Sequence, residues 1–169
     1  MLDIQGDFGG GSDTFIIVKD GPLTEKLDNT IKEYVEEYPG VFKIVTLKKN
    51  MGLAKALNKG IEQCSNEIIA RMDSDDISMP DRMERQLEAM EANRADILSG
   101  TIVEFDESVD KPTAKRELPE KNEQIIEFAK KRSPFNHPAV MYKKSAVLKY
   151  NFRVHPDDRG HHLRKVPRP

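Results

Sequence analysis

The sequence predicts an α/β fold built on a parallel sheet. Three short apolar segments, at 14–18, 41–47 and 67–72, have the β-branched composition of buried strands. Each is followed by a segment in which apolar residues recur at helical spacing, and the connections are short. Strands that alternate with helices in this way are typical of a parallel sheet with right-handed crossovers. A chain of 169 residues is long enough to bury a core as one domain.

Composition excludes several classes of protein. The net charge is −2 and no basic stripe with interleaved aromatic residues is present, which argues against a dedicated nucleic-acid binder. Cys64 is the only cysteine, so an intrachain disulfide is impossible and a reducing compartment is expected. No apolar run approaches the roughly 20 residues of a membrane span, and no signal-peptide pattern opens the chain. We therefore expect a cytoplasmic protein.

The first strand and the first helix have clear boundaries in the sequence. Residues 1–13 are rich in glycine and are expected to be a flexible lead-in. The strand at 14–18 ends shortly before Asp20, and Thr24 is a suitable N-cap for the helix that follows. The residues of this helix that recur at helical spacing are Leu27, Ile31, Tyr34, Val35 and Tyr38.

The turn after the second strand leads into another helix. Asn50 and Gly52 form this turn, which places Gly52 and Lys55 near the N-terminus of the helix. Backbone N–H groups and an ammonium group at such a position can bind a phosphate. The alternative is that Lys55 is only a solvated side chain on the outer face. The residues that this helix is expected to bury are Leu53, Leu57, Ile61 and Cys64.

Three carboxylates follow the third strand: Asp73, Asp75 and Asp76. A core cannot take such charges without compensation, so they should lie just past the carboxyl end of the strand. In an open α/β sheet, ligands bind at that edge, and clustered carboxylates are suitable ligands for a hard divalent cation. If the first and third strands are parallel in one sheet, Asp20 lies at the same edge, and one ligand could contact both groups.

The acidic segment has two other interpretations. It could be a solvated turn, in which Ser78 is the N-cap of the next helix and Pro80 lies in the first turn. It could also be a calcium loop of the EF-hand type that begins at Asp73, but this loop would require a ligand at Ile77 and a glycine at Ser78. The EF-hand interpretation therefore fails, and the solvated turn remains as the alternative to a ligand site.

The rest of the chain continues the alternation and then loses it. The helix after the acidic segment is expected to turn Met83, Leu87 and Met90 inward. The expected elements are a helix over 80–92, a strand over 96–105, a polar surface loop over 106–119, a helix over 120–131, a stiff turn over 133–138 that presents His137, and a strand over 139–142. Residues 151–169 show no hydrophobic period and are expected to be a disordered tail.

Four motifs in this order resemble one family. They are IIVKDGPLTE, NMGLAKALNKGI, IIARMDSDDISMPDRMERQ and SPFNHPAVMYKKSAV. Together they are similar to family 2 glycosyltransferases of the GT-A fold, above all to the bacterial branch that builds capsular polysaccharide, exopolysaccharide or lipopolysaccharide. The resemblance covers residues 14–150, which would form one partial domain. It implies a Rossmann-like αβα sandwich with a mostly parallel sheet.

The resemblance also implies a reaction. Family members move a sugar from a nucleotide-diphosphate donor, here UDP- or GDP-linked, to a glycan or lipid-linked saccharide acceptor during cell-surface polysaccharide biosynthesis. The transfer is inverting and is assisted by Mn²⁺ or Mg²⁺. A divalent ion that bridges the phosphates stabilises the charge that gathers on the leaving group. Such an enzyme would work in the cytoplasm or at the inner face of the plasma membrane.

The family's site residues can be transferred to matching positions. Asp20 matches the acid that contacts the nucleotide base, although Lys19 stands where the family often has a second acid. Asn50 and Gly52 match the turn that borders the nucleotide, and we add Lys55 to the donor side because of its place on the helix.

The Asp-x-Asp motif of the family matches Asp73 and Asp75. We expect Asp75 to bind the metal directly and Asp73 to contact either the ribose or the metal. Asp76 and His137 match positions on the side of the sugar or the acceptor.

Two features of the family have no clear counterpart. The catalytic base comes from a Glu-Asp pair in the family, and only Asp157 and Asp158 fall near that place, in an unrelated context. The family's opening strand should precede residue 14, and its usual apolar run is missing. We therefore expect a chain that is truncated at both ends and poorly stable.

The alternative to a transferase is a catalytically incomplete fragment or homologue that only binds the nucleotide-sugar. Two other enzyme classes, a nucleotidyltransferase and a phosphatase, are disfavoured by the flanking motifs.

Overall fold

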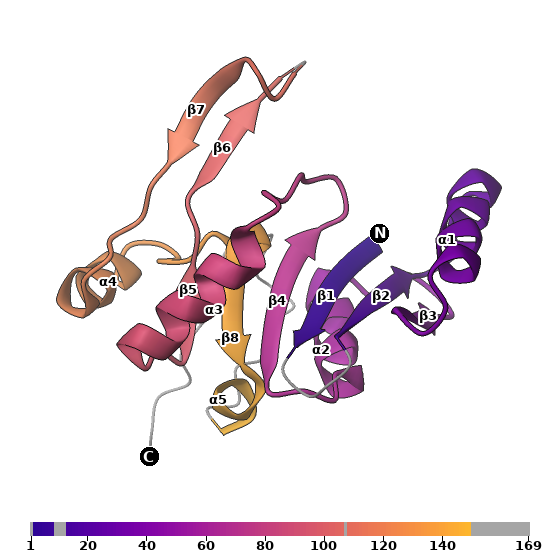
Figure 1. The fold of residues 1–169 in the computed structure, drawn as a ribbon, viewed down its shortest axis with the longest axis horizontal. Coiled ribbons are helices and arrows are strands. Elements are labelled where there is room, and N and C mark those ends of the chain that lie inside the picture. The colour runs from indigo at the N-terminus through magenta and orange to yellow at the C-terminus, as the bar shows by residue number, and fades with distance from the viewer. Residues whose placement is uncertain (1, 9–12, 107, 150–169) are drawn as a thin grey trace.

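The computed structural model describes residues 2–8, 13–106 and 108–149 (Figure 1). Within these residues, the larger sheet has six strands in the order β3-β2-β1-β4-β8-β5. Its members are β1 (Leu2–Phe8), β2 (Thr14–Asp20), β3 (Phe42–Leu47), β4 (Ile68–Asp73), β5 (Ile97–Ser99) and β8 (Val140–Lys143). The helices are α1 (Glu25–Glu37), α2 (Leu53–Gln63), α3 (Arg82–Asn93), α4 (Asn122–Ala129) and α5 (Lys144–Lys149).

Strand direction places several chain segments at one edge of the large sheet. β2 and β3 are parallel neighbours, whereas β1 is antiparallel to both β2 and β4, and β8 is antiparallel to both β4 and β5. It follows that β2, β3, β4 and β5 all run in the same direction. This confirms the predicted common direction of the first three strands, although β1 and β8 make most neighbouring pairs antiparallel. We call the edge where β2, β4 and β5 end, and where β8 begins, the carboxyl edge.

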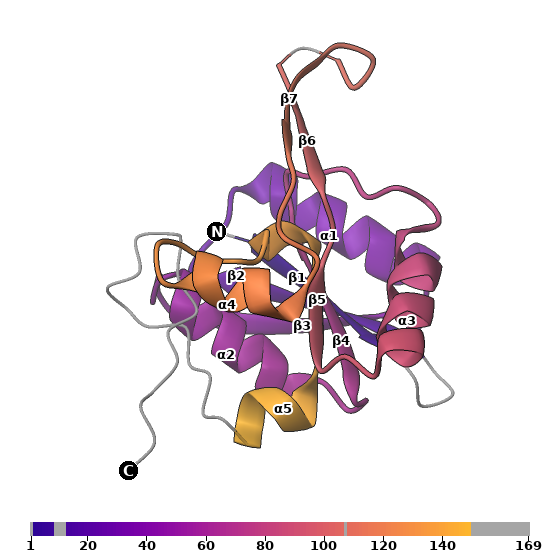
Figure 2. The same cartoon turned by 90° about the vertical axis from the view of Figure 1, so that its left-hand side faces the viewer.

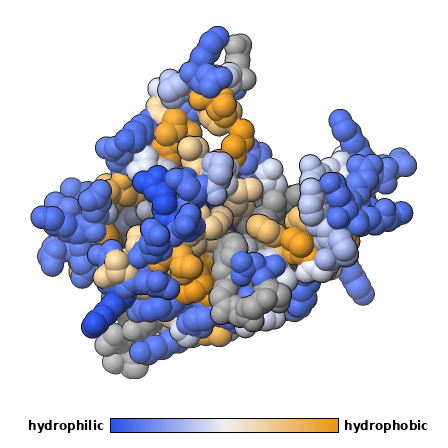
Figure 3. Space-filling model, viewed as in Figure 1, coloured by the Kyte–Doolittle hydropathy of each residue, from blue (hydrophilic) through white to orange (hydrophobic). Residues whose placement is uncertain are grey.

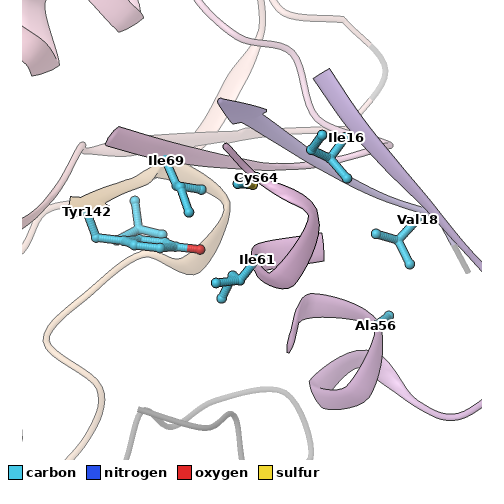
Figure 4. Packing of buried hydrophobic residues seen from close by; sticks show 8 residues of the cluster. Ile16, Val18, Ala56, Ile61, Cys64, Ile69 and Tyr142 are labelled. Carbon is cyan, nitrogen blue, oxygen red and sulfur yellow. The ribbon is translucent and has the colours of Figure 1, made fainter. Parts of the chain in front are cut away.

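The core lies on both faces of the sheet, because successive side chains of a strand point to opposite faces. On β4, Ile69 packs toward α2 while Ala70 packs toward α3. Figures 1 and 2 show these two helices on opposite faces of the sheet. The cluster on the α2 face, shown in Figure 4, contains Ile16, Val18, Ala56, Ile61, Cys64, Ile69, Val140 and Tyr142. The molecule is therefore a three-layer α/β/α fold, as the sequence predicts.

The first two helices form where they were predicted. Thr24 is the N-cap of α1, and its hydroxyl accepts a hydrogen bond from the Leu27 N–H at 3.4 Å. No residue of α1 is buried, however, and Tyr34 is 52% exposed. The rings of Tyr34 and Tyr38 stack on each other instead of entering the core. α2 buries Leu57, Ile61 and the adjoining Cys64 as predicted.

The expectation of a flexible lead-in over residues 1–13 is wrong for β1. This strand lies between β2 and β4 and forms antiparallel pairs with both. The alternation of Leu2, Ile4 and Phe8 with polar residues has the period of a strand, a signal that the neighbouring glycines hide. The strand therefore occupies the position beside β2 for which we expected no member.

The start of α3 also differs from the expectation. The helix begins at Arg82 with Asp81 as its N-cap residue, so Ser78 is not the N-cap. The predicted inward residue Leu87 is 36% exposed, whereas Gln86 is 7% exposed. The helix turns Gln86 toward the sheet because polar partners are available there, as described below.

The predicted strand over 96–105 is divided into two. β5 ends at Ser99, and the chain then leaves the large sheet and forms β6 (Ile102–Phe105). β6 pairs with β7 (Pro112–Arg116) in a separate two-stranded sheet, so the predicted loop over 106–119 contains a strand. Apolar and β-branched residues stand on both sides of Gly100, so the whole segment has the composition of one strand, which concealed this break. We call β6, β7 and their connection the arm.

The arm rises from the carboxyl edge at the end of β5 (Figure 1). Val103 and Phe105 are 51% and 37% exposed, and Figure 3 shows apolar residues reaching the surface there. α4, the turn after it and β8 follow as predicted, with a short 3₁₀ helix, η1 (His137–Ala139), directly before β8. In the described part of the chain, no helix is long and apolar enough to cross a membrane. The predicted tail over 151–169 lies outside the described residues.

Candidate functional site

The carboxyl edge brings most of the predicted site residues to one side of the sheet. Asp20 is the last residue of β2, and Asp73 is the last residue of β4. His137 begins η1, which precedes β8 and contacts β4. The shared edge of the first and third predicted strands is thus confirmed. Lys55 lies in the first turn of α2 and is exposed.

Asp20 is only 2% exposed and binds the turn that precedes α2. Its two carboxylate oxygens accept hydrogen bonds from the Met51 N–H at 2.6 Å and the Gly52 N–H at 2.9 Å. The negative charge also lies at the N-terminus of α2, where a helix favours an anion. Asp20 therefore already binds the Gly52 N–H, one of the groups that the sequence offered to a phosphate.

Two glycines make this arrangement of Asp20 and the turn possible. Gly52 has a φ of 88°, which side chains of L-residues rarely adopt, and it is the N-cap residue of α2. At Gly21 a Cβ atom would lie 2.7 Å from the backbone nitrogen of Asn50, which would force the two segments apart. The Asn50 side chain also accepts a bond from the Gly52 N–H at 3.0 Å. The turn is fixed as a rigid rim beside Asp20.

The acidic loop follows β4 directly. Asp73 accepts a hydrogen bond from the guanidinium of Arg71 at 2.5 Å, and Arg71 itself is 4% exposed. The Asp76 N–H donates to the Asp73 carbonyl at 3.2 Å, which turns the chain back over the strand end. Asp75 and Asp76 are both exposed. Arg71 therefore holds Asp73 in place, while the next two carboxylates face the solvent.

The carboxylates of this loop repel one another. Burial, and then the charges of Asp73 and Asp75, raise the pKa of Asp76 above its usual value of 3.8, although Arg71 and Arg82 oppose the shift. Burial also lowers the pKa of Arg82, while the charge of Asp76 acts in the opposite direction. Clustered negative charge of this kind would be relieved by a bound cation.

The loop carboxylates could hold a divalent ion only if a ligand completed its coordination. Within the described residues, no group of three or more His, Cys, Asp or Glu side chains is placed to hold a metal ion. Mg²⁺ commonly takes only one or two carboxylates and completes its coordination with substrate phosphates and water. Asp75 suits such a role because it is exposed, whereas Asp73 is already bound by Arg71.

The His137 turn is held at several points. His137 Nε2 lies 3.5 Å from the Ser133 hydroxyl, and the ring is half-buried. The neighbouring Asn136 is 5% exposed, and its side-chain amide donates to the carbonyls of Gly100 at 2.9 Å and Arg116 at 3.1 Å. Gly100 lies two residues before the arm and Arg116 is its last residue, so Asn136 joins the base of the arm to the turn.

Four buried polar or charged side chains in the described part of the chain surround this edge: Asp20, Arg71, Gln86 and Asn136. Sequence reasoning found only Asp20. Gln86 carries a weak signal, because it lies three residues after Met83 and four before Met90 on the same helical face. Arg71 interrupts an apolar strand, and a charge in that place indicates a buried partner. The proposed bases Asp157 and Asp158 lie outside the described residues.

Comparisons with known proteins agree with this geometry. Residues 9–151 match the family described as "Glycosyl transferase family 2". An amylovoran biosynthesis glycosyltransferase of Erwinia amylovora is 43% identical over 138 residues, which are 81% of this chain and 50% of that protein. The UDP-Gal:alpha-D-GlcNAc-diphosphoundecaprenol beta-1,3-galactosyltransferase of Escherichia coli is 39% identical over 81% of this chain and 49% of its own.

An O-antigen biosynthesis glycosyltransferase of Escherichia coli is 33% identical over 82% of this chain and 49% of its own length. The chain thus spans about half the length of the curated relatives it matches.

Proposed function

This chain belongs to glycosyl transferase family 2, and we propose that it binds a UDP-sugar and takes part in transfer of the sugar to a growing cell-surface glycan. One observation carries the proposal: the turn held by Asp20 and the acidic loop after β4 lie at the same edge of one sheet. That edge is where open α/β sheets bind ligands. The choice of UDP rests on the name of the galactosyltransferase relative, and GDP is the alternative.

The nucleoside occupies the end of the site formed by Asp20 and the turn. Asn50 and Gly52 border the nucleotide there, and the exposed Lys55 in the first turn of α2 adds a positive charge on this side of the donor. Asp20 contributes to this end mainly by fixing the turn, because both of its oxygens accept backbone hydrogen bonds. A carboxylate oxygen can accept further bonds, so a contact with the base is compatible with this role.

The diphosphate occupies the end formed by the acidic loop. Asp75 and Asp73 would hold Mn²⁺ or Mg²⁺, which supplies Lewis-acid stabilisation of the leaving diphosphate when it is bound. Arg71 orients the Asp73 carboxylate through a charge-assisted hydrogen bond. Without a cation, the loop carboxylates would repel the donor.

The acceptor occupies the side of Asp76 and His137. We propose a glycan or a lipid-linked saccharide as the acceptor, and transfer with inversion at the inner face of the membrane or in the cytoplasm. Inversion needs a general base for the acceptor hydroxyl, and Asp157 and Asp158 remain the candidates. A second candidate function is binding of the nucleotide-sugar without transfer.

Donor hydrolysis separates the two functions. UDP-galactose with Mn²⁺ is incubated with the purified chain, and free galactose is measured, because a complete transferase site releases some sugar to water. We expect Mn²⁺-dependent release that Asp75→Asn abolishes and that the distant Asp110→Asn on the arm leaves unchanged. UDP binding without release would support the binding-only function. Absence of both UDP binding and release would contradict the proposal.

A further inference from the structure

Gln86 of α3 is a buried polar residue that the proposed reaction does not use. Its side chain is 7% exposed, and both ends of its amide are hydrogen-bonded. The oxygen accepts a bond from Arg82 Nε at 3.0 Å, and the nitrogen donates to the Ala139 carbonyl at 2.8 Å. A buried amide that is satisfied at both ends has one favoured orientation. Gln86 therefore links two groups across the interior.

The first of these groups, Arg82, lies beside the acidic loop. A terminal guanidinium nitrogen of Arg82 donates to the Arg71 carbonyl at 2.8 Å. Arg71 in turn binds the carboxylate of Asp73 two residues later on β4. The charge of Asp76 also acts on Arg82 and raises its pKa against the effect of burial. The guanidinium that Gln86 holds is therefore bound to the backbone of Arg71, the residue whose side chain orients Asp73.

The second group, the Ala139 carbonyl, closes the turn that carries His137. The same carbonyl accepts the Gly100 N–H at 2.9 Å, at the point where the chain leaves β5 for the arm. The Ala139 N–H donates to the Asn136 carbonyl at 2.9 Å within the turn. The Ala139 carbonyl, at the end of η1, is thus held by two donors, the Gln86 amide and the Gly100 N–H.

We propose that Gln86 is a positioning residue that fixes the His137 turn relative to the acidic loop. Binding of a nucleotide and a cation at the loop would then change the position or environment of His137. The link runs from the loop through Arg82 and Gln86 to Ala139 and the turn. This inference rests on the proposed function, because it assumes that a nucleotide and a cation bind at the loop. An alternative role for Gln86 is packing alone, in which its amide contributes only to stability.

NMR of the His137 imidazole distinguishes these roles. The probe is UDP with Mg²⁺, a diamagnetic ion, and the His137 signal is assigned with His137→Gln. We expect UDP and Mg²⁺ to shift this signal in the wild type. In Gln86→Met, which keeps the volume and removes both hydrogen bonds, the affinity for UDP should stay within about threefold while the shift of His137 is lost. Gln124→Met, an exposed change on α4, should behave as the wild type.

Gln86→Glu provides a variant that separates the two links. Its carboxylate can still accept the bond from Arg82, now as a charge-assisted bond, but an ionised carboxylate cannot donate to the Ala139 carbonyl. We expect this variant also to bind UDP and to lose the shift of the His137 signal. If Gln86→Met does not fold, this variant distinguishes the positioning role from packing.

An unchanged His137 response in the folded variants would overturn the positioning role. A wild-type protein that binds UDP without any response at His137 would overturn it too, and would leave the proposed function intact. Loss of UDP affinity together with the response would assign Gln86 to general structural support. Absence of UDP binding in the wild type would remove both the proposed function and this inference.

Discussion

At the scale of single residues, Asp20 combines a structural role with a place in the site. Its buried carboxylate satisfies two backbone N–H groups of the turn before α2. Asp20→Asn would place an amide NH₂, which cannot accept a hydrogen bond, against one of these two N–H groups. We therefore expect the free energy of unfolding to fall by about 1–3 kcal/mol. Urea titration measures this fall. Weaker UDP binding with unchanged stability would instead show that Asp20 acts only as a ligand.

Asp76 provides a prediction for pH. The pKa of Asp76 is raised in the folded protein, so the ionised carboxylate lowers the free energy of unfolding when the pH is above that pKa. This loss of stability disappears as the pH falls through the raised pKa toward the usual value of 3.8. Asp76→Asn should therefore raise the melting temperature of the metal-free protein at pH 7, by an amount worth less than about 1 kcal/mol because the group is exposed. The difference should shrink on acidification; a difference that grows would contradict the assignment.

The sequence reveals some of these residues and hides others. Asp20, Asp73, Asp75 and Asp76 stand out because carboxylates that directly follow apolar strands need an explanation. Arg82, Gln86 and Asn136 do not stand out, since their partners are mainly backbone carbonyls or side chains brought close by the fold. Such partners carry no side-chain signature, so the packing of α3 and the arm must be known before these roles can be seen.

At the scale of elements, β1 completes the middle of the large sheet. Every backbone N–H of a central strand points to one neighbour or the other, so a proline there removes a ladder bond. Ile4→Pro should lower the free energy of unfolding by about 2–4 kcal/mol, whereas Ile4→Val should have little effect. Chemical denaturation compares the two variants. Equal stability would show that residues 2–8 contribute little to the fold.

The arm is joined to the domain mainly through Asn136. An isolated two-stranded hairpin is marginally stable in water, so its order should depend on this anchor. Asn136→Ala leaves the Gly100 and Arg116 carbonyls without their donor, and we expect backbone amides of β6 and β7 to exchange about tenfold or more faster. Hydrogen exchange measures this, with Asn93→Ala at the exposed end of α3 as the control. Equal exchange in both variants would exclude the anchor.

Elements with a clear period were predictable, and elements defined by long-range pairing were not. β2, β3, β4 and the first three helices follow from apolar spacing in the sequence, although the N-cap residue of α3 is Asp81 and not Ser78. β1 was missed because glycines near it indicate flexibility, and β7 was missed because PTAKR lacks the composition of a strand. Both strands exist because a neighbouring strand supplies hydrogen-bond partners, which local propensity does not record.

At the scale of the whole molecule, the direction of the strands produces the site. Four strands run the same way, so their ends collect the Asp20 turn, the acidic loop and the base of the arm at one edge. The antiparallel β8 adds the His137 turn to the same edge. The sequence predicted that Asp20 and the acidic loop share an edge. It could not predict how the arm and the turn join them, because that depends on contacts between distant segments.

Calorimetric titration with UDP tests the central claim, that this edge binds a nucleotide through a divalent cation. We expect UDP to bind in the presence of Mg²⁺ or Mn²⁺ and to bind at least about tenfold more weakly in EDTA, because the loop carboxylates would then face the phosphates unshielded. Asp75→Asn should remove the metal dependence without unfolding the protein, and Asp110→Asn should retain it. Equal UDP affinity with and without the metal, or a loss of fold in Asp75→Asn, would contradict the account.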